Sequence, residues 1–263
     1  MPFLFDSPTQ RLHYTIHAHG HAPWLTFFHP LGSDSQIWSE QFAAFKGSHR
    51  LLAVDIRGHG RSAVSPHPYT LRDIALDVIL LWDALGVERS HVCGVSLGGL
   101  IVQALCLEAA TRIDRSVICC MAANGGSQTA WQQRMAAVRS SGLAALVPAT
   151  LERWFTPAYR QHQADRIAPI ADCFRRTSIK GYLDACQAIA TTDYTQCTAR
   201  MTGPMCVIAA EQDVAFPPEH LQRFANTLPH ACFRCIPGAH LCQFESAPDF
   251  NRTVAAFLTA TVG

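Results

Sequence analysis

The stretch that decides the fold reads His91-Val92-Cys93-Gly94-Val95-Ser96-Leu97-Gly98-Gly99. An apolar run opens it, and apolar residues at helical spacing continue from Leu97 to Leu105. A strand, a G-x-S-x-G turn and a helix in succession form the nucleophile-elbow signature, a sharp turn that holds a serine at strained backbone angles. Glycines two residues before and after the serine remove Cβ atoms that would otherwise clash. We therefore expect Ser96 to project its hydroxyl where a substrate and a base can reach it.

Length and composition are typical of a compact enzyme with one domain and an insertion, or with two small domains. The chain has 263 residues, of which 49% are hydrophobic and 16% charged. A net charge of +1 gives no reason to expect nucleic acid or a membrane surface as a partner. The N-terminus has no basic region typical of a signal peptide, and no apolar run is long enough to span a bilayer. Because the eleven cysteines are irregularly spaced and mostly lie in apolar segments, we expect buried thiols and a reducing, cytoplasmic location.

Short, continuous apolar runs predict strands that are covered on both faces. Between the runs lie helical patterns, the clearest from Leu71 to Leu85 with Gly86 as its stop signal. Residues 3–5 and 11–17 alternate weakly and suggest an antiparallel edge hairpin. This alternation of strand and helix predicts an α/β fold with a mostly parallel, doubly wound sheet. The predicted buried strands are 24–28, 51–54, 91–93, 117–121, 206–210 and 232–236.

The alternation breaks between residues 123 and 193, where the sequence has helical patterns and no clear strand. We predict that residues 123–193 form a helical cap inserted into a core of residues 1–122 and 194–263. The cap carries more basic than acidic side chains, which suits an anionic small-molecule substrate. Its basic residues are Arg134, Arg139, Arg153, Arg160, Arg166, Arg175, Arg176 and Lys180.

A serine hydroxyl needs a base, and the base needs a group that orients it. In a strand-turn-helix site of this kind the acid and then the histidine follow the serine along the chain. Among the three late histidines, His240 follows the last predicted strand, whereas His220 lies in a predicted helix and His230 precedes the strand. Active sites of open α/β sheets gather at the carboxyl ends of the strands, which favours His240 as the base.

Two acids follow the strand 206–210, and Asp213 is placed better than Glu211 because the loop needs a few residues to reach the histidine. Glu211 stays the alternative acid. The oxyanion that forms during attack needs two backbone N–H donors, for which we predict Leu97 and Leu31. Pro30 has no N–H, and His29 is interpreted as a brace for the loop. The sequence shows no metal-ligand spacing and no nucleotide-binding glycine motif, so we expect no metal and no such cofactor.

At this point the chain resembles the α/β-hydrolase superfamily over nearly its whole length. The resemblance is carried by His29-Pro30-Leu31-Gly32, by 55–62, by the elbow, and by Asp213 and His240. Within the superfamily it is similar to the 3-oxoadipate enol-lactonase family. The motifs are Trp131-Gln132-Gln133-Arg134, 151–157, 181–189, Gly238-Ala239-His240-Leu241 and Glu245. The chain departs from the family's usual residues at Pro30, Phe216, 109–111 and Cys242-Gln243-Phe244.

The resemblance implies an α/β-hydrolase fold with a cap and a cytoplasmic serine esterase or lactonase of aromatic catabolism. It also implies that Ser96 opens 3-oxoadipate enol-lactone to 3-oxoadipate without a cofactor. Arg134 is the first candidate to bind the substrate carboxylate, because a guanidinium binds a carboxylate through two hydrogen bonds. Trp131 and Trp154 are candidate pocket walls. The sequence does not determine the oligomeric state.

Other functions fit the same three residues. A carboxylesterase, a C–C bond hydrolase and a cofactor-free perhydrolase all use such a serine, and a non-catalytic binding protein keeps the fold alone. Epoxide hydrolases and haloalkane dehalogenases use an aspartate nucleophile, so Ser96 argues against both.

Overall fold

One mixed sheet organises the described chain. The computed structural model describes residues 2–7, 10–18 and 20–260, so the predicted core's outermost residues, 1 and 261–263, lie outside it. Within these ranges eight strands form a sheet in the order β1-β2-β4-β3-β5-β6-β7-β8. Strand β2 is antiparallel to both of its neighbours, and the other pairs are parallel. The strands are β1 Pro2–Asp6, β2 Arg11–His17, β3 Trp24–Phe28, β4 Arg50–Val54, β5 Ser90–Val95, β6 Ile113–Cys119, β7 Met205–Ala210 and β8 Ala231–Ile236.

The predicted strands and the edge hairpin are confirmed, with one boundary wrong. The predicted burial of 232–236 is also wrong, because β8 lies at the edge of the sheet and only its last residue, Ile236, is buried. Strands β3, β5 and β7 are buried at every residue, as continuous apolar runs require. The strand predicted at 117–121 instead runs from Ile113 to Cys119. It ends there because Cys120 has a φ of 51°, which no strand residue adopts.

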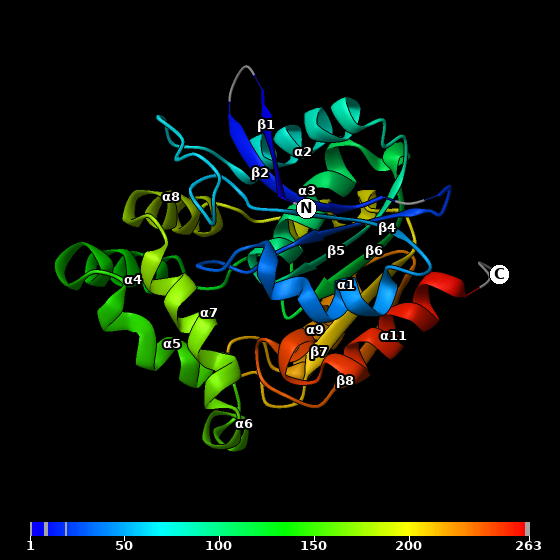
Figure 1. Cartoon of the computed structure of the whole chain (residues 1–263). Coiled ribbons are helices and arrows are strands. Elements are labelled where there is room, and N and C mark those ends of the chain that lie inside the picture. The colour runs from blue at the N-terminus through cyan, green and yellow to red at the C-terminus, as the bar shows by residue number, and fades with distance from the viewer. Residues whose placement is uncertain (1, 8–9, 19, 261–263) are drawn as a thin grey trace.

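Helices cover both faces of the sheet (Figure 1). Helices α2 and α3 pack together on one face, and α1 and α11 lie on the other. The α-helices are α1 Ser39–Phe45, α2 Leu71–Leu85, α3 Leu97–Glu108, α4 Gln128–Ser141, α5 Val147–Trp154, α6 Pro157–His162, α7 Ala164–Arg176, α8 Ile179–Ala190, α9 Pro218–Ala225, α10 Cys242–Glu245 and α11 Ala247–Thr259. The 3-10 helices are η1 Ser35–Trp38, η2 Ala110–Arg112, η3 Ala144–Leu146 and η4 Thr195–Arg200.

Helix α2 spans the predicted range because both of its ends carry local signals. At the N-terminus, Thr70 and Asp73 form a capping box in which each side chain accepts a hydrogen bond from the other's backbone N–H. At the C-terminus, Gly86 takes a left-handed φ of 64°. Its apolar face is buried against the sheet and α3.

Between β6 and β7 the chain leaves the sheet and forms helices α4 to α8, which lie to one side of it (Figure 1). This is the segment for which the sequence predicts a cap. An isolated bridge pairs Asn124 with Asp193 where the chain leaves and returns. Helix α8 touches the core at Gly181, whose Cα lies so close to Gly58 that a Cβ on either residue would overlap the other's backbone.

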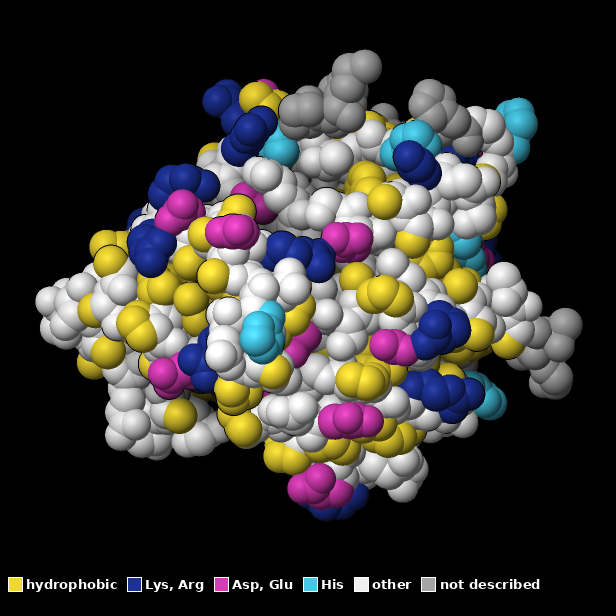
Figure 2. All heavy atoms as spheres, turned by 60° about the horizontal axis from the view of Figure 1, so that its bottom comes forward, with side chains coloured by type: hydrophobic (Ala, Val, Ile, Leu, Met, Phe, Trp, Pro, Cys, Tyr) yellow, Lys and Arg dark blue, Asp and Glu magenta, His cyan; other side chains and the backbone are white. Residues whose placement is uncertain are grey.

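The surface carries charges of both signs. Basic and acidic side chains are interspersed on the face seen in Figure 2, in keeping with the net charge of +1. In the described part of the chain, every helix is too short or too polar to cross a bilayer.

Candidate active site

Ser96 sits in the strained turn between β5 and α3. Its backbone has φ 56° and ψ −120°, a conformation that non-glycine residues rarely adopt. The two motif glycines allow this turn: a Cβ on Gly94 would overlap the Gly98 carbonyl, and a Cβ on Gly98 would overlap the Phe28 carbonyl. The Ser96 N–H donates to the Cys119 carbonyl at 2.9 Å, which ties the turn to β6. The packing therefore holds the strained conformation of the serine in place.

Asp213 and His240 form a buried pair at the carboxyl ends of β7 and β8. Nδ1 of His240 lies 2.8 Å from Oδ2 of Asp213. The other carboxylate oxygen of Asp213 accepts hydrogen bonds from the N–H groups of Ala215 and Phe216. Burial acts to raise the pKa of Asp213, but His240 and these N–H groups outweigh it and lower that pKa below its ordinary value. Asp213 is therefore an anion at neutral pH, fixed against one ring nitrogen of His240.

The loop that carries His240 is attached to the helices above the sheet. The Leu241 N–H donates to the Trp154 carbonyl at 3.0 Å. The Glu245 carboxylate accepts hydrogen bonds from the N–H groups of Ala239 and Thr156, and from the Thr156 hydroxyl. Glu245 thus joins the histidine loop to the end of α5.

Leu97 directly follows Ser96 in the turn, and Leu31 lines the same pocket as Ser96. In the described part of the chain, neither backbone N–H has a hydrogen-bond partner. His29 fixes the loop that carries Leu31: its Nδ1 contacts the Pro30 carbonyl and its Nε2 accepts from the Ile56 N–H. Burial lowers the pKa of His29, which keeps its ring neutral. This contact pattern fits the predicted bracing role.

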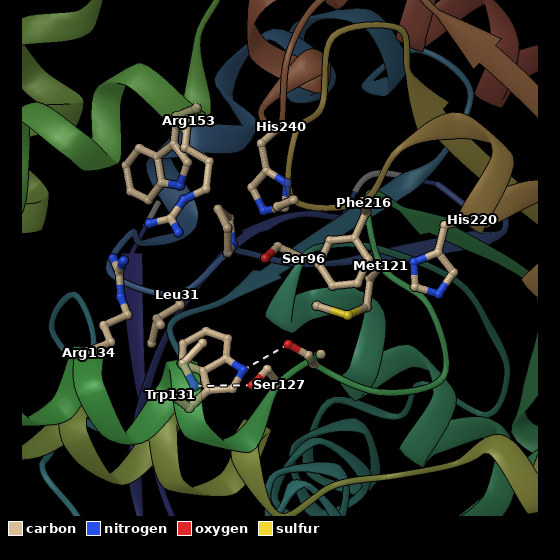
Figure 3. A pocket seen from close by; sticks show the side chains of 16 residues that line it. Leu31, Ser96, Met121, Ser127, Trp131, Arg134, Arg153, Phe216, His220 and His240 are labelled. Carbon is tan, nitrogen blue, oxygen red and sulfur yellow. Dashed lines mark hydrogen bonds between the residues drawn. The ribbon is translucent and has the colours of Figure 1, made fainter.

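A pocket of about 300 Å³ brings together residues of the core and of the inserted helices. Ser96 and His240 both face it, with the imidazole next to the hydroxyl in Figure 3, although no hydrogen bond joins these two described side chains. Such contacts are often long without substrate and tighten when it binds. The pocket is lined by Pro30, Leu31, Ser96, Met121, Gly125, Gly126, Ser127, Ala130, Trp131, Arg134, Arg153, Trp154, Ala215, Phe216, His220 and His240.

Two arginines reach the pocket from the inserted helices, Arg134 from α4 and Arg153 from α5 (Figure 3). Arg134 donates from Nε to the Tyr182 hydroxyl at 2.6 Å and from Nη2 to Thr150. Arg153 has no ion pair or hydrogen bond with any described residue. Its pKa is lowered by burial first and by the neighbouring charge of Arg134 second. Arg153 is therefore a partly desolvated cation beside a second arginine, and neither arginine has an acidic partner in the described chain.

The structure brings several of the predicted site residues to one pocket. Trp131, Trp154 and Arg134 line the pocket, and Trp131 is fixed by donating from Nε1 to the Gly125 carbonyl. Glu211 is exposed and His230 lies away from the pocket, so neither competes with Asp213 or His240.

Sequence patterns alone do not identify Arg153, Phe216 or His220 as pocket residues. His220 lies in a predicted helix after the strand 206–210, and this helix, α9, brings it to the pocket. The Phe216 ring stacks between His220 and His240, with centroid distances of 6.1 and 6.2 Å. The only sequence signal for Arg153 is the excess of basic over acidic side chains in residues 123–193, and this signal does not separate it from the other arginines there.

Comparison with known proteins agrees with this geometry. The alpha/beta hydrolase fold family matches residues 23–247, so the chain belongs to that family and is a hydrolase by descent. It is 31% identical to 3-oxoadipate enol-lactonase 1 of Acinetobacter baylyi, over 90% of this chain and 89% of that protein. It is also 29% identical to RutD of Variovorax paradoxus, named as a candidate carbamate hydrolase, over 94% of this chain and 96% of that protein.

A solved structure is similar as well. The crystal structure of the enol-lactonase from Burkholderia xenovorans LB400 superposes with a TM-score of 0.93 at 36% identity, over 95% of this chain and 97% of that one. The expected α/β-hydrolase fold and the likeness to enol-lactonases are thus confirmed.

Proposed function

We propose that this chain is a serine hydrolase that opens a carboxylate-bearing enol-lactone, such as 3-oxoadipate enol-lactone. The proposal rests on the set of residues that line the pocket. Its lining includes a strained serine, the histidine of the histidine–aspartate pair, and two arginines that have no acidic partner among the described residues. The serine and the histidine suit acyl transfer, and the arginines suit an anionic substrate.

In the proposed mechanism, His240 takes the proton of Ser96 as its oxygen attacks the lactone carbonyl. Asp213 holds the His240 tautomer and stabilises the imidazolium that forms. The free N–H groups of Leu31 and Leu97 donate hydrogen bonds to the developing oxyanion, an interaction worth about 3 kcal/mol per donor in comparable enzymes. The ring opens, and the leaving enolate is protonated and becomes a ketone. Water activated by His240 then releases the acid, so these steps need no cofactor.

The helices α4 to α8 act in this proposal as the cap over the core, with 123–193 as the inserted segment. Arg134 and Arg153 bind the substrate carboxylate, while Trp131 and Trp154 form pocket walls. Because Tyr182 and Thr150 already hold the Arg134 side chain, its position is set before substrate binds. Arg153 has no such partner, so the substrate carboxylate supplies the counter-charge that it lacks.

A substrate panel tests the reaction class. Purified enzyme is assayed on 3-oxoadipate enol-lactone, a neutral aryl ester and a carbamate. We expect the highest kcat/KM on the enol-lactone, and a loss of roughly 10⁴-fold or more in Ser96→Ala on every substrate. An equal or higher kcat/KM on the aryl ester or the carbamate would contradict the lactonase proposal. Unchanged rates in Ser96→Ala would contradict the serine mechanism.

The carboxylate-binding role of Arg153 predicts a selective defect. Arg153→Gln removes a charge-assisted hydrogen bond worth about 1.5–3 kcal/mol, so KM for the enol-lactone should rise about 10- to 100-fold. Turnover of the neutral ester should change little. Arg139→Gln is the matched control, because Arg139 is an exposed arginine of α4 that does not line the pocket. Equal losses on both substrates would show that Arg153 supports the fold and does not select the substrate.

A further inference from the structure

Three buried cysteine thiols meet directly beneath the histidine–aspartate pair. The Sγ atoms of Cys119 and Cys242 are 3.4 Å apart, those of Cys120 and Cys242 are 3.8 Å apart, and those of Cys119 and Cys120 are 3.7 Å apart. All three side chains are fully buried. No step of the proposed hydrolysis uses them.

The backbone brings these thiols together in an unusual way. Adjacent residues of a strand point to opposite faces of the sheet, so Cys119 and Cys120 should diverge. Cys120 avoids this because its φ is 51°, one of two positive values at non-glycine residues of the described chain. The other such residue is Ser96, whose strain serves the elbow. Cys242 completes the triangle from the first residue of α10.

We infer that Cys119, Cys120 and Cys242 form a binding site for a thiophilic d¹⁰ cation of the Zn²⁺ and Cd²⁺ class. In a tetrahedral zinc site with Zn–S bonds of about 2.3 Å, neighbouring sulfurs are about 3.8 Å apart. The three thiols already stand at nearly this spacing, so they can bind the ion with little movement. On binding, the cation replaces the thiol protons, which pass to the solvent.

The site touches the catalytic pair. One ligand atom each from Cys120, Asp213 and His240 lie within 4.8 Å of one another. His240 is also only two residues before Cys242. A fourth donor from His240 would use a ring nitrogen that either contacts Asp213 or faces Ser96, and one from Asp213 would use an oxygen that now holds His240 or the N–H groups of Ala215 and Phe216. Metal binding and proton transfer by His240 therefore compete, and an occupied site should inhibit hydrolysis.

The test first removes the solvent-accessible thiols, so that any metal bound through sulfur is bound by buried thiols. Cys173, Cys197, Cys232 and Cys235 are partly or fully exposed, so all four are changed to serine in the background protein. Cd²⁺ alone is titrated into this reduced full-length protein. Equilibrium dialysis gives the stoichiometry, and ultraviolet thiolate-to-metal charge-transfer absorption reports the ligands. We expect one Cd²⁺ per chain with a saturable charge-transfer band.

Single substitutions then identify the ligands. Cys119→Ala and Cys242→Ala should each abolish the band, whereas Cys106→Ala, a buried cysteine of α3 outside the triangle, should keep it. Thermal melting without metal shows that each variant folds, and Cys242→Ser replaces any alanine variant that does not. A missing band in the background protein, or a band that persists in Cys119→Ala or Cys242→Ala, would overturn the site.

Activity supplies a separate measurement. Cd²⁺ should inhibit hydrolysis of a neutral ester at the concentration that fills the band, and Cys242→Ala should relieve this inhibition at least 10-fold. Inhibition that is unchanged in Cys242→Ala would mean that the metal binds His240 from the pocket and would overturn the competition argument. Ser96→Ala should still bind Cd²⁺. The metal-binding test therefore remains valid even if the protein does not catalyse the proposed hydrolysis.

Discussion

The conformation and charge of the catalytic candidates depend on the residues packed directly around them. Ser96 can keep its strained backbone because Gly94 and Gly98 have no side chains to collide with the turn. Asp213 can stay charged while buried because two backbone N–H groups and His240 surround it. At this scale the active site depends on backbone geometry as much as on side-chain chemistry.

The role of Asp213 in orienting His240 predicts a large kinetic effect with little structural change. Asp213→Asn keeps the side-chain shape but removes the negative charge and favours the wrong imidazole tautomer, so kcat should fall about 10⁴-fold. Glu211→Gln is the matched control, because Glu211 is exposed two residues away on the same loop. Steady-state kinetics on the enol-lactone and circular dichroism provide the measurements. A comparable loss in Glu211→Gln would show that the wrong acid has been assigned.

What could be predicted at the residue scale follows from strand order and chain position. Ser96, Asp213 and His240 each follow a mainly apolar strand, and parallel strands bring such positions to one edge of the sheet. Arg153 could not be separated from the other cap arginines in this way. Several of those pair with acids, as Arg166 does with Glu40, and only the packing of α5 shows which arginine reaches the pocket.

At the scale of elements, the central question is how the inserted helices are held over the sheet. Several contacts do this, among them that of Gly58 with Gly181 of α8 and that of Glu245 with Thr156 and Ala239. The sequence predicts the helices from their local periodicity and caps, as for α2. It cannot predict these contacts, because they join residues far apart in the chain that meet only after packing.

The Glu245 contact predicts that the cap and the histidine loop lose stability together. In Glu245→Gln the neutral amide is a weaker acceptor than the carboxylate, and charge-assisted hydrogen bonds are worth about 1.5–3 kcal/mol. We expect a lower free energy of unfolding by roughly 1–2 kcal/mol, and a fall in kcat/KM of about 10-fold as His240 becomes less well positioned. Denaturant unfolding and enzyme kinetics measure both. Glu219→Gln on the exposed side of α9 is the control. Equal losses of stability and of kcat/KM in Glu219→Gln would contradict the specific role of Glu245.

At the scale of the whole molecule, two buried carboxylates lie at the carboxyl edge of the sheet. Asp213 follows β7, and Asp55 follows β4. Asp55 bonds to His13 through Oδ2 and accepts hydrogen bonds from the N–H groups of Ser35 and Arg61. It thereby links β2, η1 and the loop after β4. The molecule thus relies on anions that must remain ionised while buried, which couples its stability to pH.

This coupling predicts acid unfolding with a defined sign. Burial acts to raise the pKa of Asp55, but its hydrogen bonds with His13, Ser35 and Arg61 outweigh it and lower that pKa from 3.8 to about 2. Because the folded pKa is the lower one, the stabilisation is complete above the unfolded value and is lost as pH falls from about 5 to 2. A shift of this size corresponds to about 2 kcal/mol.

Urea unfolding of wild type between pH 7 and pH 2.5 should therefore show a falling free energy of unfolding. Asp55→Asn should be less stable at pH 7 and should lose less stability on acidification, because it has no carboxylate to protonate. Asp165→Asn, an exposed acid of α7, should follow the wild-type curve. If Asp55→Asn instead lost stability as steeply as wild type over this range, the acid sensitivity would have to come from other buried carboxylates such as Asp213.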